Sequence, residues 1–332
     1  MVVFRRCLAA WLCFLAAALA PVAHAADLED ASHVLVLGRI SDDPKEHYEQ
    51  LKPLLDYVVP RMASVGIREG RILMAHDVQQ MNSYLRRGRV DWVTETPGTG
   101  MLLQQGSGAK PLLLTERDGF SQYTTVFFAR RDSGIRSLAD LRGRNVAFQA
   151  PYSTSAYYVP ATALLDSHLP LQILLSPMDR PDPRGVGYLF ARTELNISTW
   201  VHKRLVDAGV MSNIDWQNPQ RVPAGFRADL VIVHETPPYP RALEMVRGDL
   251  DPKVEARLRE VLLEASKDPD AREALLRFFK TTRFLPVDDN ARHSLRARRG
   301  PSKLPAALRA GVLPPSDRGR RAPSRVRAGT AG

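Results

Sequence analysis

The chain has 332 residues, of which 44% are hydrophobic and 25% are charged, so it can bury one large core or two cores of ordinary size. Its formal net charge of +10 comes from residues 291–332, which hold eleven basic side chains and one acidic one, whereas the remaining 35 basic and 35 acidic side chains balance. This distribution argues against a nucleic-acid partner, and the tail, rich in Pro, Gly, Ala and Arg, is predicted to be disordered.

The chain begins with a targeting segment, residues 1–25. Arg5 and Arg6 provide a positive start, residues 7–20 form an apolar run, and residues 23–25 (Ala-His-Ala) supply the small residues of a cleavage site. The run is shorter than the ~20 residues that a membrane-spanning helix needs. A cleaved signal peptide and export to a periplasm are therefore predicted, with a retained membrane anchor as the alternative.

Both cysteines, Cys7 and Cys13, lie inside this segment. The mature chain would therefore have no disulfide, no thiolate metal site and no cysteine nucleophile. The residue before Cys13 is Leu12, not the small residue normal before a lipid-attachment cysteine, which favours a soluble protein over a lipoprotein. The eight histidines are scattered without metal-ligand spacing, so neither a metal nor a cofactor is predicted.

The first part of the body alternates short apolar strands with amphipathic helices. Asp43 is predicted to cap the first helix, because Pro44 follows it at the first helical position. Repeated strand–helix–strand units of this length predict a largely parallel sheet with helices on both faces. The predicted strands are 33–38, 71–75, 90–94 and 112–114, and the predicted helices are 44–63 and 78–87.

A longer strand of alternating polar and apolar residues, 122–130, begins a second unit of the same kind. The fold class is therefore α/β with two units, and the second unit can be an insertion into the first. The further predicted strands are 145–149, 171–175 and 229–234, and the further predicted helices are 156–167, 197–208 and long helices across 252–280.

Three hydroxyl side chains, Ser153, Thr154 and Ser155, stand between the strand 145–149 and the helix that follows it. Hydroxyls and the unpaired N–H groups of a helix start can bind an anion without Lys or Arg. Ligands in open α/β sheets bind beyond the carboxyl ends of strands, where this cluster is predicted to lie. Serine or threonine before a helix is also an ordinary N-cap, so the residues alone leave both interpretations open.

Five phrases in this part of the chain carry a resemblance to a known family. They are 132–135 (Asp-Ser-Gly-Ile), 138–143 (Leu-Ala-Asp-Leu-Arg-Gly), 146–148 (Val-Ala-Phe), 153–155 (Ser-Thr-Ser) and 206–210 (Val-Asp-Ala-Gly-Val). In this order they resemble the PhnD-like family of phosphate/phosphite/phosphonate-binding proteins, the periplasmic substrate-binding components of ABC transporters. The similarity runs along nearly all of the body of the chain.

The resemblance implies the two-lobe fold of a type 2 periplasmic binding protein, in which each lobe is a mixed sheet flanked by helices. Lobe one would be residues 33–121 plus 236–290, and lobe two would be residues 122–235. Two crossing strands, around 123–129 and 233–237, would join the lobes, which close on a ligand in the cleft between them.

The resemblance also implies that Ser153, Thr154 and Ser155 hold phosphoryl or phosphonyl oxygens, and that Asp207 is the acidic residue of the cleft. A carboxylate repels an oxyanion unless a proton lies between them. Asp207 would therefore select a protonated ligand oxygen or an amine, or it is an ordinary solvent-facing carboxylate.

The chain departs from the family pattern at three places. Ala156 replaces the usual Gly after the hydroxyl triplet, and the loop after the strand 90–94 lacks the usual aromatic residue and carries Thr94, Glu95 and Thr96. A second-lobe position that is often His is replaced in the stretch Glu194-Leu195-Asn196. If these residues face the cleft, the two added acids suit a ligand with an amine or a retained proton. Tyr48 and Tyr123 would add phenol donors at the rim, or they pack with their hydroxyls at the surface.

Catalysis is not predicted, because no Gly-x-Ser-x-Gly elbow and no histidine close in sequence to the serines suggest a hydrolase. The predicted function is a monomeric periplasmic binding protein that captures phosphate, phosphite or phosphonate in an interlobe cleft. It would deliver this phosphorus oxyanion to an ABC permease in the inner membrane. The alternatives are a ligand-sensing module of the same fold coupled to a membrane sensor kinase, and a binder of another small anion or amino acid.

Overall fold

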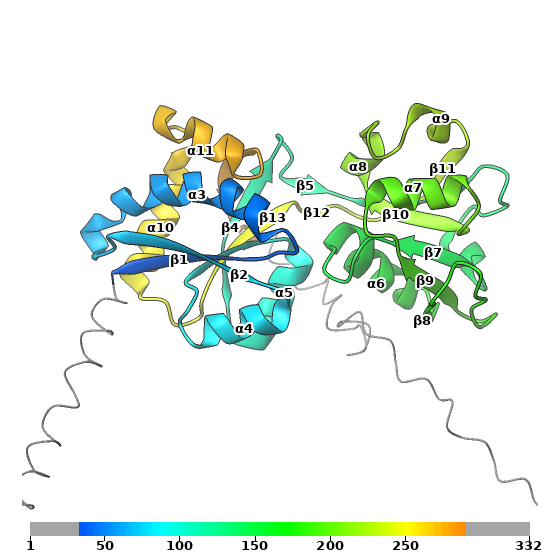
Figure 1. Ribbon diagram of the computed structural model, residues 1–332, viewed down its shortest axis with the longest axis horizontal. Helices are drawn as coiled ribbons and strands as arrows, with labels where there is room; N and C mark the ends of the chain where they lie inside the picture. The colour runs from blue at the N-terminus through cyan, green and yellow to red at the C-terminus, as the bar shows by residue number, and fades with distance from the viewer. Residues whose placement is uncertain (1–32, 290–332) are drawn as a thin grey trace, which may run out of the picture. The chain divides into compact units, whose positions relative to one another are not determined.

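The chain folds into two units, each built around its own six-stranded sheet, in the computed structural model, which describes residues 33–289. Unit 1 holds residues 33–124 and 237–289, and unit 2 holds residues 125–236 (Figure 1). No helix in this described range is long and apolar enough to cross a membrane. The predicted signal peptide, 1–25, and the predicted basic tail, 291–332, lie outside the described residues.

The chain leaves unit 1 after Thr124 and returns to it after Thr236, so residues 122–124, predicted in the second lobe, belong to unit 1. Its short strand β5 (Gln122–Tyr123) pairs antiparallel with β12 (Tyr239–Pro240), with Tyr123 opposite Tyr239.

The sheet of unit 1 is mixed. Strands β1, β2, β3 and β4 run in one direction, while β13, inserted between β3 and β4, and β14 run antiparallel to their neighbours. The antiparallel strands come from the segment after residue 236, which the sequence analysis assigned mainly to helices. The sheet order is β14 (Thr281–Pro286), β4 (Lys110–Arg117), β13 (Ala242–Val246), β3 (Trp92–Glu95), β1 (Val34–Ile40) and β2 (Glu69–Ala75).

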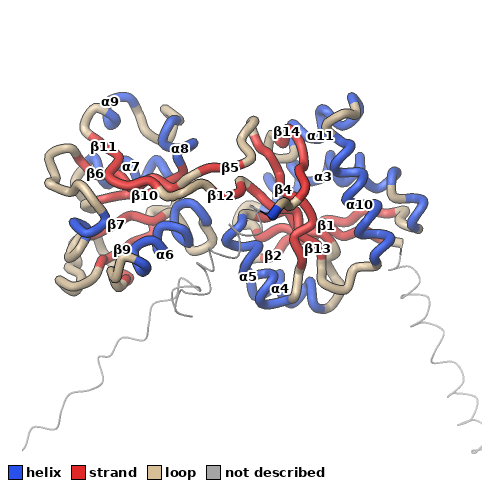
Figure 2. Tube along the Cα trace, turned by 180° about the vertical axis from the view of Figure 1, so that it is seen from behind, coloured by secondary structure: helices blue, strands red, loops and turns tan. Residues whose placement is uncertain are grey.

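Helices cover both faces of this sheet, α3, α10 and α11 on one face and α4 and α5 on the other (Figures 1 and 2). The Asp43 carboxylate accepts the Glu46 N–H at 3.1 Å, and Pro44 is the first helical residue, as the sequence predicts. The helices are α3 (Pro44–Arg61), α4 (Val78–Arg86), α5 (Pro97–Ser107), α10 (Pro252–Ala265) and α11 (Arg272–Arg277).

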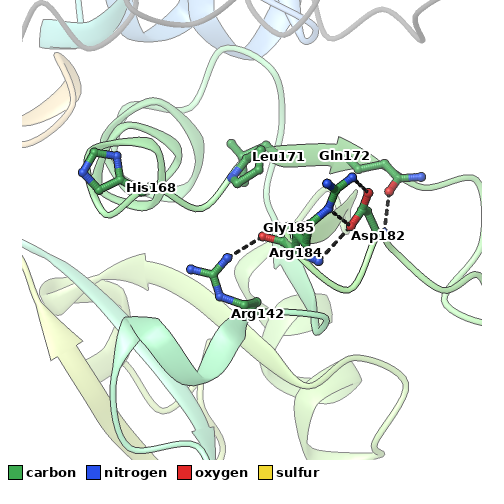
Figure 3. A pocket seen from close by; sticks show the side chains of 8 residues that line it. Arg142, His168, Leu171, Gln172, Asp182, Arg184 and Gly185 are labelled. Atoms are coloured by element: carbon green, nitrogen blue, oxygen red, sulfur yellow. Dashed lines mark hydrogen bonds and ion pairs between the residues drawn. The ribbon is translucent and has the colours of Figure 1, made fainter.

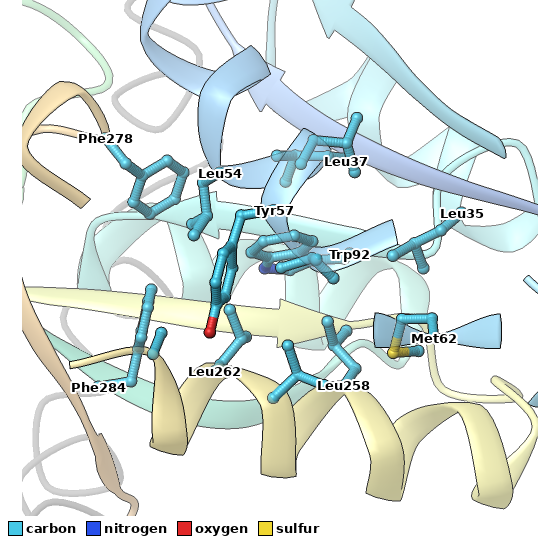
Figure 4. Close-up of a cluster of buried hydrophobic side chains, with 14 of the residues drawn as sticks. Leu35, Leu37, Leu54, Tyr57, Met62, Trp92, Leu258, Leu262, Phe278 and Phe284 are labelled. Carbon is cyan, nitrogen blue, oxygen red and sulfur yellow. The ribbon is translucent and has the colours of Figure 1, made fainter. Parts of the chain in front are cut away.

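The core between the sheet and α3, α10 and α11 is built from aliphatic and aromatic side chains (Figure 4). Trp92 lies within it with none of its surface exposed, and its ring centroid is 6.3 Å from that of Phe278. Burying a large apolar side chain of this kind contributes about 1.5–3 kcal/mol, so this layer is a principal source of the stability of unit 1.

Helix α5 is absent from the sequence prediction, which interpreted its Gly-rich start as a loop. Pro97 occupies the first helical turn, where its missing N–H costs nothing, and Met101 and Leu103 are buried against the sheet. Gly100 is required by packing, because a Cβ there would lie 2.7 Å from the Met245 sulfur. The glycines therefore permit close contact between a helix and the sheet.

The sheet of unit 2 has a parallel core. Strands β7, β8, β9 and β10 run in one direction, and β6 runs antiparallel to both β10 and β11. Strands β9 and β10 were not predicted from the sequence, and the predicted helix 197–208 runs into the first residue of β10. The sheet order is β11 (Leu230–Glu235), β6 (Thr125–Arg130), β10 (Ala208–Ser212), β7 (Asn145–Phe148), β9 (Val186–Phe190) and β8 (Leu171–Ile173).

Helices also cover both faces of this second sheet, α7 and α8 on one face and α6 on the other (Figure 1). A π-helical turn, Thr154–Tyr158, leads directly into α6, and in it the Tyr158 N–H donates to the Ser153 carbonyl. The helices are α6 (Val159–Asp166), α7 (Glu194–His202), α8 (Asn213–Gln217) and α9 (Ala224–Arg227).

Close packing of α7 on β10 explains Gly209 in the Val-Asp-Ala-Gly phrase. A Cβ at Gly209 would lie 2.5 Å from Ile197 Cγ2 and 2.7 Å from Phe128 Cζ. We expect Gly209→Ala to destabilise the protein by about 1–3 kcal/mol, because three core side chains would have to move. Urea unfolding would measure this loss.

Gly225→Ala is the matched control for this substitution, since a Cβ at Gly225 meets nothing within 4 Å. In helix α9 alanine should be neutral or stabilising. Equal unfolding free energies for the two variants would contradict the packing argument.

Candidate functional site

The carboxyl edge of the sheet in unit 2 gathers most of the polar groups that the sequence analysis singled out. Strands β7, β9 and β10 are parallel, so their carboxyl ends share one edge, and β6 begins there because it runs the opposite way. Ser153, Thr154 and Ser155 follow β7, and helix α7 follows β9. This edge is where open α/β sheets bind ligands.

The first hydroxyl of the cluster caps the turn. Ser153 Oγ accepts the Ala156 N–H at 3.2 Å, which is the structural role left open by the sequence. Ala156 has φ −113° and ψ 18°, so the turn is irregular. The Ser153 hydroxyl still carries a proton, because a hydroxyl accepts and donates at once.

The other two residues of the cluster differ in burial. Thr154 is buried at 3% exposure, whereas Ser155 is half-buried. The Ser155 carbonyl accepts the Thr125 Oγ1 proton at 2.8 Å, and Thr236 Oγ1 accepts the Thr125 N–H at 3.0 Å. Within residues 33–289, the Ser155 hydroxyl itself makes no hydrogen bond. The turn is therefore fixed by its backbone while Ser155 keeps a free hydroxyl.

Asn196 lies at the same edge, in the first turn of α7. Its Nδ2 donates to the Ala191 carbonyl at 2.8 Å, and the Ala191 N–H donates to the Phe148 carbonyl at the end of β7. Thr193 Oγ1 caps the helix by accepting the Asn196 N–H at 3.1 Å. The structure thus places Asn196 at the same edge as the hydroxyl cluster.

Two acidic side chains approach each other at this edge. Burial raises the pKa of Glu194, and the nearby Asp215 carboxylate raises it further. Asp215 is held at the start of α8 by the Ser212 hydroxyl, which donates to it at 2.5 Å. The edge therefore combines hydroxyl donors with a carboxyl group that retains its proton more readily than an exposed one.

Asp207 does not join this cluster. Its Oδ2 accepts the Asn145 N–H at 2.9 Å, and Arg144 Nη1 donates to its Oδ1 at 3.3 Å. Asn145 begins β7, so Asp207 lies at the amino edge, the length of a four-residue strand away from the hydroxyls, or roughly 13 Å. The structure therefore does not bring Asp207 together with the hydroxyls, because α7 ends at His202 and the following loop carries Asp207 to the other edge.

In unit 1, Thr94 and Glu95 are engaged within the sheet. Glu95 accepts the Ile40 N–H at 3.0 Å and the Thr96 N–H at 3.3 Å, and it is 4% exposed. Thr94 is fully buried, and its hydroxyl donates to Glu244 at 2.9 Å. The polar atoms of Thr94 and Glu95 thus have partners within unit 1, and their contact with a ligand stays a prediction. Thr96 is half-buried and precedes α5.

The two predicted tyrosines lie in different surroundings within unit 1. Tyr48 is 43% exposed on α3, whereas Tyr123 is 4% exposed in β5. The Tyr123 ring lies 4.5 Å from that of Tyr239, and the Arg241 guanidinium lies 4.8 Å from its centre. Tyr123 is thus a packed residue, and only Tyr48 presents its ring to solvent.

A buried polar network around Glu244, in the middle of β13, was not predicted from the sequence. The Glu244 carboxylate accepts hydrogen bonds from Trp92 Nε1 at 2.7 Å, Thr94 Oγ1 at 2.9 Å and Thr115 Oγ1 at 2.6 Å. Burial raises the pKa of Glu244 to about 7 in spite of these donors. A single acidic residue within the apolar run Ala-Leu-Glu-Met-Val was the available signal.

A second feature of unit 2 is a pocket of about 360 Å³ at the amino edge of its sheet (Figure 3). Its basic groups are occupied by its own loop, since Arg142 Nη1 donates to the Arg184 carbonyl at 2.7 Å and Arg184 pairs with Asp182 at 3.1 Å. Because the pocket lies at the edge opposite the hydroxyl cluster, we do not assign the anion site to it.

Two α/β units, one with hydroxyl groups and a helix start at the carboxyl edge of its sheet, have the fold of a type 2 periplasmic binding protein. Residues 38–291 match the family described as "ABC transporter, phosphonate, periplasmic substrate-binding protein". The match spans most of the chain, and the protein belongs to this family. Its members are periplasmic and work with the permease of an ABC transporter.

Solved structures agree with this assignment. XAC2383 from Xanthomonas citri, bound to chloride ion, is 54% identical, with a TM-score of 0.79 over 85% of this chain and 100% of its own. The same protein bound to ATP gives a TM-score of 0.76 at 54% identity, over 84% and 97%. PhnD1 from Prochlorococcus marinus, in complex with methylphosphonate, is 16% identical, with a TM-score of 0.58 over 80% and 97%, and shares the fold.

Proposed function

We propose that this protein captures a phosphorus oxyanion in the periplasm, without catalysis and as a monomer, and delivers it to an ABC permease after export by a cleaved signal peptide. The observation that carries the proposal is the turn 153–155, with its free Ser155 hydroxyl, at the carboxyl edge of the sheet. Neutral hydroxyl and N–H donors bind an oxyanion without competing counter-charges, which suits reversible capture.

The acidic pair at the same edge bears on the ligand's protonation state. The raised pKa of Glu194 beside Asp215 favours a ligand that shares a proton or carries an amine. Phosphite, phosphate monoanion and aminoalkylphosphonates meet this condition. XAC2383 has been solved with ATP, so a phosphate ester belongs among the candidates as well.

The test removes the three hydroxyls together, as Ser153→Ala, Thr154→Ala and Ser155→Ala. We expect affinity for the preferred oxyanion to fall at least ~100-fold, because each charge-assisted hydrogen bond contributes about 1.5–3 kcal/mol. Calorimetry would compare phosphate, phosphite, methylphosphonate, aminoethylphosphonate, sulfate, chloride and ATP.

Ser167→Ala is the matched control, since within residues 33–289 that hydroxyl bonds only the Ala163 carbonyl, at 2.8 Å, at the end of α6. Circular dichroism would check folding, because loss of the Ser153 cap alone costs about 1 kcal/mol. Unchanged affinity in the folded triple variant would leave the turn a cap and nothing more. Hydrolysis of a phosphate ester would contradict the non-catalytic part of the proposal.

A further inference from the structure

Two guanidinium groups converge on one aromatic ring at the carboxyl edge of the sheet in unit 1. Arg39 Cζ lies 4.5 Å and Arg117 Cζ 4.4 Å from the centre of the Phe279 ring. Arg39 stands near the end of β1 and Arg117 ends β4, and these two strands are parallel. Thr94 connects them, because Arg39 Nη1 donates to its carbonyl at 3.0 Å and Arg117 Nη2 donates to its hydroxyl at 3.1 Å.

Most of the hydrogen-bonding capacity of the pair is unused. A guanidinium has five N–H donors, and within residues 33–289 each of these two makes one hydrogen bond. The Nε atoms of Arg39 and Arg117 are both buried and have no partner in this range. Arg117 is only 6% exposed. A buried donor without a partner costs about 1–3 kcal/mol, and more when it is charged, so an acceptor is missing from this cluster.

The neighbouring carboxylates do not supply that acceptor. Glu95 receives backbone N–H groups, and Glu244 receives Trp92 and two threonine hydroxyls. Neither arginine forms an ion pair with a carboxylate of the described chain. Both carboxylates therefore accept hydrogen bonds from groups other than the two arginines.

The local charge is also positive. Burial, followed by the charges of Arg39 and Arg241, lowers the pKa of Arg117 to about 9. His47, hydrogen-bonded to Ser41 at 2.6 Å, has its pKa lowered to about 4 by burial and by Arg39. Three guanidiniums thus face two carboxylates, one of which, Glu244, is readily protonated near neutral pH.

We propose that Arg39 and Arg117 form an oxyanion-binding site in unit 1, with Phe279 holding the two guanidinium planes. The Nε/Nη2 fork of Arg39 matches two oxygens of a carboxylate or phosphoryl group, and Arg117 supplies a second charge. Phe279 has φ 52° and Lys280 has φ 53°, so the backbone that carries this ring adopts a left-handed conformation uncommon for residues other than glycine. This arginine site lies entirely within unit 1 and shares no residue with the hydroxyl turn of unit 2.

The test uses the full chain carrying Arg39→Gln, which keeps a polar side chain and removes the charge and the fork. Calorimetry with phosphate, pyrophosphate, succinate and sulfate distinguishes a phosphoryl group from a carboxylate. We expect at least a tenfold loss of affinity for the oxyanion that binds best. Arg71→Gln is the control for the same change of charge, because Arg71 is exposed on β2 beside Glu69.

The outcomes separate this site from the hydroxyl turn. Weaker binding in Arg39→Gln, whether or not the triple-alanine variant also binds weakly, supports the arginine site. Wild-type affinity for all four anions in Arg39→Gln overturns it, even if the triple-alanine variant has lost its ligand and so upholds the proposed function. If Arg71→Gln lost as much anion affinity as Arg39→Gln, the loss would come from the change in net charge alone, and the site would also be overturned. An absence of binding of any of the four anions to the wild type overturns it as well.

Discussion

Replacing Trp92 by alanine should destabilise unit 1 by at least about 4 kcal/mol. The loss of a fully buried indole from the layer between the sheet and α3, α10 and α11 costs about 3–5 kcal/mol through lost contacts and a residual cavity. The substitution also removes the Nε1–H that donates to the buried Glu244 carboxylate at 2.7 Å, which adds about 1–3 kcal/mol. Thermal and urea unfolding followed by circular dichroism would measure the loss.

A pair of milder variants separates packing from the hydrogen bond. Trp92→Phe keeps most of the ring and loses the donor to Glu244. Trp216→Phe makes the same change at a residue that is 6% exposed and donates no side-chain hydrogen bond within residues 33–289. We expect Trp92→Phe to cost about 1–3 kcal/mol more than Trp216→Phe. Equal costs would mean that the Trp92–Glu244 hydrogen bond contributes nothing measurable.

The parts of the fold that depend on local pattern could be predicted from the sequence. The Asp43 cap with Pro44 behind it marks the start of α3, and the apolar runs mark β1, β2 and β3. The short strand β10 was missed, because Ala208–Ser212 contains only two large apolar residues and gains its stability from burial between β6 and β7. Helix α5 was missed because its glycines favour a loop when tertiary packing is unknown.

The residues of the candidate site also differ in whether their place follows from local sequence features. The place of Ser153, Thr154 and Ser155 follows from a strand end and a helix start, which are local features, so it could be predicted. The place of Asp207 depends on the end of α7 and the path of the loop after it, which a family phrase does not specify. Long-range pairs such as Arg39 with Arg117 come from strands far apart in the sequence, and no spacing rule identifies them.

Glu244→Gln should remove a pH dependence from the stability of unit 1. The pKa of Glu244 is about 7 in the folded protein, raised by burial from an ordinary value of 4.5. Between these two values the folded state binds a proton that the unfolded state has released, so stability falls as pH rises through this window. Between pH 5 and pH 8 the wild type should lose roughly 2–3 kcal/mol relative to the glutamine variant.

The difference between the two proteins isolates this effect, because every other titrating group is common to both. Glutamine keeps an oxygen for the Thr94 and Thr115 hydroxyls but faces Trp92 Nε1 with an amide N–H, which shifts the difference by an amount that does not vary with pH. Glu273→Gln, at a side chain that is 79% exposed beside Arg277, should give a nearly flat difference. Urea unfolding at pH 5, 6, 7 and 8 would measure both, and a flat difference for Glu244→Gln would mean that Glu244 stays ionised across this range because its three donors outweigh its burial.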